Sequence, residues 1–194
     1  MAGMGKGKSG RPRRAAPPPA AGDIGAQLRK AVAAHQAGRL DQARAAYEEI
    51  LRSQPEQFDA LHLLGVVALQ RGEYQESVDL IARAIEVGPE NAEAWSNRGT
   101  ALLHLKRLEE ALASYERAVA LKPAFADAWS NRGNALLQLK RPADALASCD
   151  RALALKSDHA EAWSSRGKAL RDLKRPQEAL ASFDRVFALR SAHP

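Results

Sequence analysis

Residues 95–99 read Trp-Ser-Asn-Arg-Gly, and residues 129–133 repeat these five letters 34 positions later. A third tryptophan, Trp163, follows after a further 34 residues and again precedes a glycine, Gly167, by four positions. Self-similarity at one fixed period is the sequence signature of a repeat protein. The chain is therefore expected to be an array of similar units.

Other positions keep the same period. A small residue recurs sixteen positions after each tryptophan, and a core-type residue follows four positions later. These residues are Ala111, Ala145, Ala179, Tyr115, Cys149 and Phe183. The same frame extends backwards with weaker matches over two more units. It predicts five units, at 24–57, 58–91, 92–125, 126–159 and 160–193.

Each unit is predicted to contain two amphipathic helices. In 92–125, the apolar residues of the second helix recur at spacings of three and four, which places them on one face. These residues are Leu108, Ala111, Leu112, Tyr115, Ala118 and Val119. Pro142 and Pro176 suit the first turn of a helix, where no backbone N–H is needed. Trp129 is expected at an inter-helix contact, so Trp129→Ala is predicted to cost about 3–5 kcal/mol.

The pattern resembles the tetratricopeptide repeat (TPR) over residues 24–193. The resemblance implies an all-α fold, a right-handed superhelical solenoid of five helix-turn-helix repeats whose leading helices line the concave face. Local departures are Cys149 in place of an aromatic residue, and Ser157 and Ser191 in place of the closing proline. The repeated Ser-Asn segment is also similar to the amide ladder in the TPR region of bacterial O-linked N-acetylglucosamine transferases, where it holds substrate peptide.

Charge is concentrated at the N-terminus. The chain has 194 residues and a formal net charge of +6, and residues 1–22 carry five basic residues and no acid. This Gly/Pro-rich tail is predicted to be disordered, as a solubilising leader or, alternatively, as a contact for nucleic acid. A single cysteine excludes an intrachain disulfide, and the apolar run 63–69 is too short to span a bilayer. No signal peptide is recognised, so a cytoplasmic location and no membrane partner are predicted.

No catalytic set emerges from the sequence. The five histidines show no metal-ligand spacing, and no glycine-rich phosphate loop is present. Cys149 occupies a core position and is expected to be a buried thiol. We therefore predict no enzyme activity, no cofactor and no metal.

Repeat proteins bind their partners on the extended concave surface. Helix spacing places twelve mostly neutral polar residues there, which could hydrogen-bond an extended peptide. The alternative is that they are ordinary surface residues. The predicted site residues are Ser96, Asn97, Thr100, His104, Ser130, Asn131, Asn134, Gln138, Ser164, Ser165, Lys168 and Asp172.

The predicted function is a protein-interaction scaffold that binds an extended polypeptide in its groove. One alternative is the substrate-recruiting TPR region of a glycosyltransferase whose catalytic domain is absent from this chain. Another is binding of nucleic acid or an acidic partner through the tail and a basic edge stripe. The stripe comprises Lys106-Arg107, Lys140-Arg141 and Lys174-Arg175, and cations at helix C-termini are the preferred interpretation.

The end of the array predicts a further contact. The last helix carries Phe183, Val186, Phe187 and Leu189, and no capping helix follows them in this sequence. Natural arrays close their outer face with a polar cap. We therefore expect self-association through this helix, or its continuation in a longer architecture.

Overall fold

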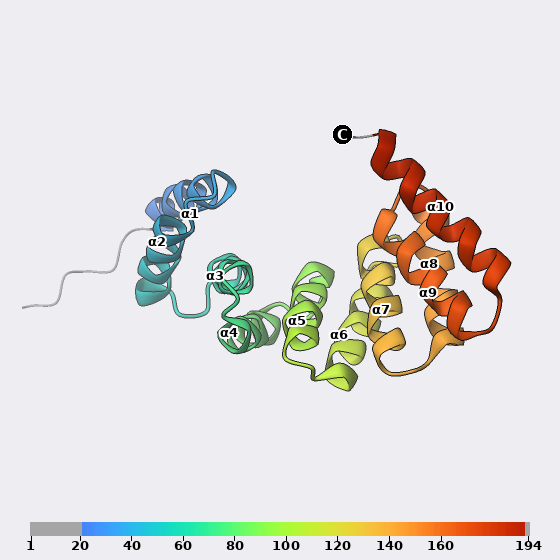
Figure 1. Cartoon of the computed structure of the whole chain (residues 1–194). Coiled ribbons are helices and arrows are strands. Elements are labelled where there is room, and N and C mark those ends of the chain that lie inside the picture. Colours follow the sequence, from blue (N-terminus) through green and yellow to red (C-terminus); the bar gives the residue numbers. More distant parts are fainter. Residues whose placement is uncertain (1–20, 193–194) are drawn as a thin grey trace, which may run out of the picture.

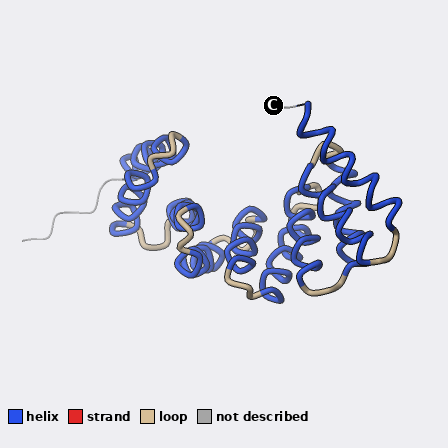
Figure 2. Tube along the Cα trace, viewed as in Figure 1, coloured by secondary structure: helices blue, strands red, loops and turns tan. Residues whose placement is uncertain are grey.

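The computed structural model describes residues 21–192, which form ten α-helices and no strand (Figures 1 and 2). The helices are α1 Ala21–Gln36, α2 Leu40–Ser53, α3 Phe58–Gln70, α4 Tyr74–Val87, α5 Ala92–His104, α6 Leu108–Leu121, α7 Ala126–Gln138, α8 Pro142–Leu155, α9 Ala160–Asp172 and α10 Pro176–Ala192. The basic residues of the predicted tail all lie outside the described residues, and α1 already begins at Ala21.

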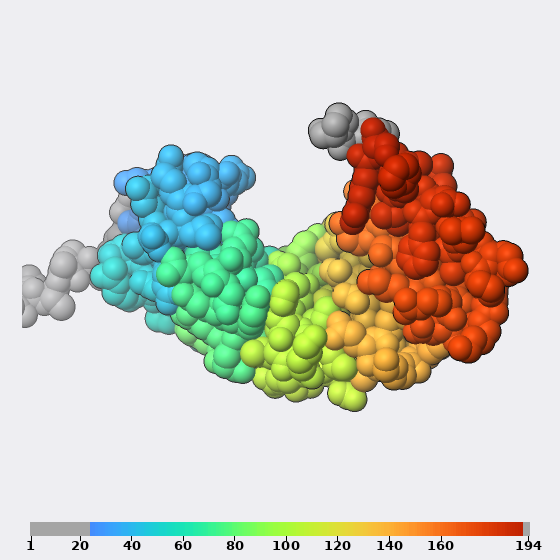
Figure 3. All heavy atoms as spheres, viewed as in Figure 1, coloured from blue at the N-terminus to red at the C-terminus, as the bar shows by residue number. Residues whose placement is uncertain are grey.

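The helices form a curved TPR-type solenoid. Each helix packs against the one before and the one after it, and consecutive pairs such as α3 and α4 pack most extensively. Odd-numbered helices also contact the next odd-numbered helix, whereas no two even-numbered helices within residues 21–192 contact each other. The odd-numbered helices therefore form the inner row of the array. The space-filling view shows an arc with an open hollow between its two ends (Figure 3).

The turn inside each pair has one recurring backbone geometry. The second residue after the leading helix adopts a positive φ, between 60° and 78°, at Gly38, Gly72, Lys106, Lys140 and Lys174. The next backbone N–H then bonds back into the helix, as Arg107 N does to Leu102 O at 3.0 Å. This is the Schellman arrangement that satisfies the last carbonyls of a helix. Glycine adopts it without strain, so the three lysines hold a conformation that is costly for a residue with a Cβ.

The core repeats with the sequence period. One core position recurs on the trailing helices, four residues after the small residue. Its first four residues, Tyr47, Ile81, Tyr115 and Cys149, have no exposed surface. The fifth, Phe183, is 36% exposed. Small residues on the leading helix make room for these side chains, because a Cβ on Gly99 would lie 2.8 Å from Cε1 of Tyr115. The predicted role of this position as core is confirmed in the first four units.

The tryptophans lie beside the turns that join neighbouring units. Trp95, Trp129 and Trp163 are only half-buried. Each indole Nε1 donates a hydrogen bond to a carbonyl in the preceding inter-repeat turn, at 2.8–3.0 Å. Two of these acceptors belong to the closing prolines, and the third is Ser157 O. Trp129 also packs against the cluster of Ala118, Val119 and Ala128, so it lies at the predicted inter-helix contact between α6 and α7, with part of its ring exposed.

A periodic arginine bridge was not predicted. Arg98, Arg132 and Arg166 each lie over a tryptophan ring, with the guanidinium carbon 5.6–5.9 Å from its centroid. Each also donates to a serine hydroxyl of the trailing helix in the same unit, at 2.6–3.0 Å. These serines are Ser114, Ser148 and Ser182. In unit 58–91 the equivalent pair is Leu64 and Leu80, both buried.

Candidate functional site

The inner row exposes most of the predicted site residues. Asn97, Thr100, Asn131, Asn134, Gln138 and Ser164 are half-buried, and His104, Lys168 and Asp172 are exposed. Three serines differ, since Ser96, Ser130 and Ser165 are only 5%, 2% and 7% exposed. All three serines therefore offer little side-chain surface to a ligand, which differs from the exposure expected of groove residues.

Several of the remaining side chains are engaged by neighbouring residues of this chain. Asn97 Nδ2 lies 3.0 Å from Nε2 of His62 on α3. Thr100 Oγ1 bonds Ser96 O and the Tyr115 hydroxyl, both at 3.1 Å. The amide ladder predicted from Asn97 and Asn131 is consequently interrupted at its first member.

Two residues at the edge of the inner row are also engaged. The Gln138 side chain accepts a hydrogen bond from Nζ of Lys106 at 3.2 Å. The His104 ring stacks on Tyr74, with centroids 4.4 Å apart and planes 2° from parallel. Both residues therefore contribute contacts between neighbouring units.

The C-terminal half of the inner row is different. Within residues 21–192, the side chains of Asn131, Asn134, Ser164 and Lys168 have no hydrogen-bond or ionic partner. They lie on α7 and α9, which contact each other more extensively than any other two leading helices. These four side chains are thus available to a ligand.

A hollow of about 390 Å³ joins this region to the last helix. We call it the inner hollow. It is lined by Asn134, Ala160, Glu161, Ser164, Ser165, Lys168 and Arg190. The structure therefore brings together four predicted residues, Asn134, Ser164, Ser165 and Lys168, and adds three that were not on the predicted list.

Arg190 reaches the inner hollow because α10 is unusually long. It has 17 residues, whereas the trailing helices α2, α4, α6 and α8 have 14 each. Ser191 stands where the first three units have a closing proline. Ser157 does the same in unit 126–159, yet α8 ends at Leu155, so the missing proline permits a longer helix without dictating it. The sequence therefore contains no clear signal for the longer helix or for the approach of Arg190 to the inner hollow.

The charges around the inner hollow favour an anion. Lys168 and Arg190 supply two exposed cations. The single carboxylate, Glu161, lies 3.2 Å from Nδ1 of His159, whose Nε2 is 3.0 Å from Oδ1 of Asp127. The Asn134 amide can donate and accept, and the Ser164 hydroxyl can do the same. The arrangement is suited to a peptide backbone with an acidic group, and it contains no nucleophile–base pair.

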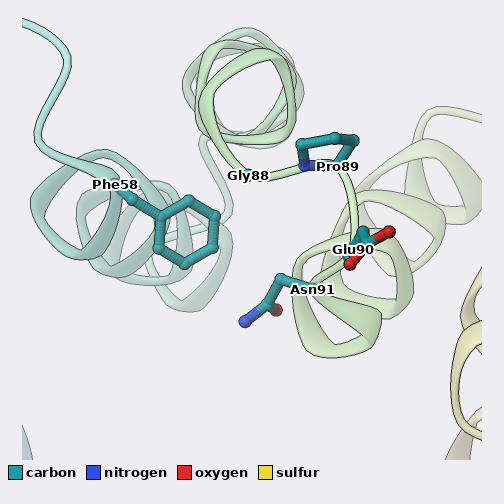
Figure 4. Close-up of a pocket in the computed structure, with 5 residues that line it drawn as sticks. All are labelled: Phe58, Gly88, Pro89, Glu90 and Asn91. Carbon is teal, nitrogen blue, oxygen red and sulfur yellow. The ribbon is translucent and has the colours of Figure 1, made fainter.

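A larger hollow lies elsewhere, at the turn between α4 and α5 (Figure 4). It measures about 550 Å³ and is lined by Phe58, Gly88, Pro89, Glu90 and Asn91. Its polar groups already serve the fold, since Asn91 Oδ1 caps α5 by accepting from Ala94 N at 2.8 Å and Pro89 O accepts from Trp95. The Glu90 carboxylate points away from the Phe58 ring. We interpret this hollow as turn packing.

Other reactive groups are accounted for by the core. Cys149 has no exposed surface, and burial raises the pKa of its thiol to about 12. It is therefore a neutral packing group.

No cluster of three potential metal ligands occurs among residues 21–192. In the same range, no helix has both the length and the apolar character needed to cross a bilayer.

His62 makes stability depend on pH. Burial lowers the pKa of its imidazole, and the carboxylates of Asp59 and Glu93 oppose this only in part. A folded-state pKa below the unfolded value means that the unfolded chain binds the proton more readily. Neutral His62 makes its full contribution to the unfolding free energy above the pKa of the unfolded chain, near 6.5. This contribution is lost as the pH falls below that value.

We therefore expect the unfolding free energy to fall as the pH drops from about 7.5 through the unfolded value of 6.5, and to fall less steeply in His62→Gln. Urea titrations of both proteins across this range measure the difference. The contribution of acidic groups with lowered pKa values, such as Glu93, is lost mainly as the pH falls below their unfolded value of 4.5, so the slopes are compared above about pH 5.5. Equal slopes in the two proteins would show that His62 contributes nothing.

Comparison with known proteins agrees with the repeat fold described above. Family models described as "Tetratricopeptide repeat" match residues 28–87, 72–124 and 150–194, and a second such model matches 126–159. No curated protein sequence is significantly similar to the chain. Similar solved structures do exist. MamA, residue 41 to the end, from Desulfovibrio magneticus RS-1 has a TM-score of 0.80 at 22% identity, over 90% of this chain and 99% of that chain.

A second solved structure is described as "YrrB: a TPR protein with an unusual peptide-binding site". It has a TM-score of 0.73 at 23% identity, over 86% of each chain. Another crystal structure of MamA has a TM-score of 0.76 at 20% identity, over 87% of this chain and 92% of that chain. At these identities the likeness concerns the fold. Because the family models together cover most of the sequence, the chain belongs to the tetratricopeptide repeat family.

Proposed function

We propose that this TPR scaffold binds an extended polypeptide along its inner row, with an acidic side chain of the peptide in the inner hollow. The observation that carries the proposal is the set of unpartnered polar side chains on α7 and α9 beside two exposed cations. YrrB, which shares the fold, is described as having a peptide-binding site.

The chemistry of these side chains explains how binding would work. Asn131 and Asn134 can each pair with a backbone N–H or C=O, and such a bond contributes about 0.5–1.5 kcal/mol net. A hydrogen bond to a charged group contributes about 1.5–3 kcal/mol, so Lys168 and Arg190 would provide the larger part through a peptide carboxylate. The polar bonds give affinity with little demand on peptide sequence, and the cations select for acidity.

An immobilised array of random peptides, half of them containing Asp or Glu, tests the proposal. The acidic half is expected to capture the protein. Asn131→Ala with Lys168→Ala is expected to weaken the affinity for captured peptides about tenfold or more, since each lost bond contributes on the order of 1 kcal/mol. Fluorescence anisotropy with the best peptide measures this. Equal affinity in the wild type and the double variant would exclude the site.

A matched control removes the same kinds of group, one cation and one amide, away from the inner hollow. Arg151→Ala with Gln177→Ala removes one exposed cation and one exposed amide from the trailing helices α8 and α10. We expect its affinity for the peptide to equal that of the wild type. A loss as large as that of the inner-row variant would show that general charge, and not the inner hollow, attracts the peptide.

The two other predicted functions gain no support from the contacts. In the basic stripe, Arg107, Arg141 and Arg175 each form an ion pair with an acid three residues later, at 2.6–2.7 Å, so half of the cations are neutralised locally. For the glycosyltransferase alternative, the amide ladder is interrupted where Asn97 bonds His62. We therefore favour the polypeptide scaffold.

A further inference from the structure

The outer face of α10 carries large apolar side chains with nothing described above them. Leu180 is 62% exposed and Phe187 is 74% exposed. The equivalent residues of unit 92–125 are Leu112 and Val119, and each is 7% exposed. The difference arises because α7 follows that unit and covers its trailing helix, α6, whereas no helix within residues 21–192 follows α10.

The interior junctions show what normally covers these positions. At the Phe187 position, Ile85 packs with Ala94 of the next leading helix, and Val119 packs with Ala128. At the Leu180 position, Val78 belongs to one cluster with Ala101. Likewise, Leu146 packs in one cluster with Ala169. In these junctions a large apolar residue of a trailing helix packs near an alanine of the next leading helix. The α2–α3 junction differs, since it has Arg44 and Val67 at the Leu180 and Ala33 positions.

Helix α1 also has alanines at these two equivalent positions, Ala26 and Ala33, and they are exposed. Their counterparts on the later leading helices have no exposed surface; they are Ala60, Ala94, Ala128, Ala162, Val67, Ala101, Ala135 and Ala169. The α1 face therefore has the small side chains that an incoming trailing helix requires.

The ion pairs between neighbouring units recur with the same period of 34 residues. Between units, Arg132 pairs with Glu116 at 3.0 Å and Arg166 pairs with Asp150 at 2.7 Å. The corresponding residues at the two ends of the array are Lys30 on α1 and Asp184 on α10. Both are exposed, and neither has a partner among residues 21–192. One end thus offers the cation and the other the carboxylate of this inter-unit pair.

We propose that α10 of one copy of this chain packs on α1 of a second copy and continues the repeat across the junction. Phe187 would lie on Ala26, Leu180 on Ala33, and Asp184 beside Lys30. The two surfaces differ, so the contact is heterologous, and each copy keeps one free end after pairing. Association therefore produces chains of copies and not a closed dimer.

Sedimentation of the full chain tests this. The mean mass is expected to rise continuously from that of one chain, 21.0 kDa, as the concentration increases from micromolar to millimolar. A chain that stays monomeric throughout would overturn the proposal. This result is expected if the N-terminal residues of the chain, or another protein, cover the α1 and α10 faces. A plateau at the mass of two chains would also overturn it, because a heterologous contact leaves free ends.

Two variants block one end each. Phe187→Glu places a charge on the α10 face, and Ala33→Arg places a bulky side chain on the α1 face. Both positions are exposed, so each variant should keep the wild-type helix content by circular dichroism. Each alone is expected to weaken association about tenfold or more, because a central apolar contact is lost.

Mixing the two variants separates head-to-tail pairing from symmetric pairing of two α10 faces. In an equimolar mixture, the intact α10 of Ala33→Arg meets the intact α1 of Phe187→Glu. A dimer containing one of each is expected, with no larger species. If Ala33→Arg alone assembles as well as the wild type, the pairing does not use α1 and the proposal fails.

A charge exchange checks the register. Lys30→Glu or Asp184→Lys alone is expected to weaken association several-fold, since like charges then face each other. A chain carrying both changes restores opposite charges and should recover wild-type assembly. If both changes together weaken association as the sum of the single effects, these two residues do not meet at the junction.

Discussion

Tyr115→Ala is expected to lower the free energy of unfolding by about 3–5 kcal/mol, the range for removing a large buried side chain. Tyr115 has no exposed surface, and its ring lies against Gly99 on the facing helix. Its hydroxyl bonds Thr100 Oγ1 at 3.1 Å, and burial raises the pKa of the phenol to about 12, so it stays neutral. Because Tyr115 lies in the middle unit, its loss weakens the array at its centre.

Urea denaturation followed by far-UV circular dichroism measures this change, and two control variants sharpen it. Tyr115→Phe keeps the ring and loses one hydrogen bond, so we expect about 1 kcal/mol. Trp129→Ala removes a half-buried ring and should cost about 1–3 kcal/mol, less than the sequence predicted for it. A larger loss for Trp129→Ala than for Tyr115→Ala would contradict this assignment of the core.

Gly133→Val is expected to destabilise the protein by about 1–3 kcal/mol through overpacking. A Cβ at this position would lie 2.7 Å from Sγ of Cys149 and 3.3 Å from the Ala145 carbonyl. The carbonyl belongs to the α8 backbone and cannot move aside without shifting that helix. Because valine is a better helix former than glycine by several tenths of a kcal/mol, the clash must exceed that gain for the protein to lose stability.

A double-mutant cycle with the smaller change Gly133→Ala, which adds only the Cβ, isolates the clash with Sγ of Cys149. Cys149→Ala removes the Sγ atom, so Gly133→Ala should be far less harmful in that background than in the wild type. Gly25→Ala is the matched control, since the nearest atom to its added Cβ is Nη1 of Arg29 at 3.6 Å, an ordinary contact. Additive effects of Gly133→Ala and Cys149→Ala would show that the two helices do not approach closely there.

The sequence predicted the helical fold well because its decisive contacts are local. Ala111 and Tyr115 meet the preceding helix of their own unit, so a spacing of four within one repeat was enough to place them in the core. The Arg98–Ser114 bridge could not be predicted in the same way. An arginine is normally assigned to solvent, and this one is held by a tryptophan face and a hydroxyl of another helix.

The candidate site was predicted less completely, since it depends on side-chain directions and on where one helix ends. Spacing identified Asn131, Asn134 and Lys168 on the inner row. It could not show that Asn97 bonds His62, because that contact joins two units through one pair of rotamers. Arg190 was missed because the extra residues of α10 carry an arginine into the inner hollow from a helix assigned to the outer row.

The uneven contact between leading helices has a mechanical consequence. From α1 to α7, neighbouring leading helices touch sparsely, and the trailing helices do not touch each other at all within the described residues. There, neighbouring units are joined mainly where a trailing helix packs on the next leading helix. Between α7 and α9 the leading helices add a broad contact of their own. We therefore expect the relative orientation of units to be fixed most firmly beside the inner hollow.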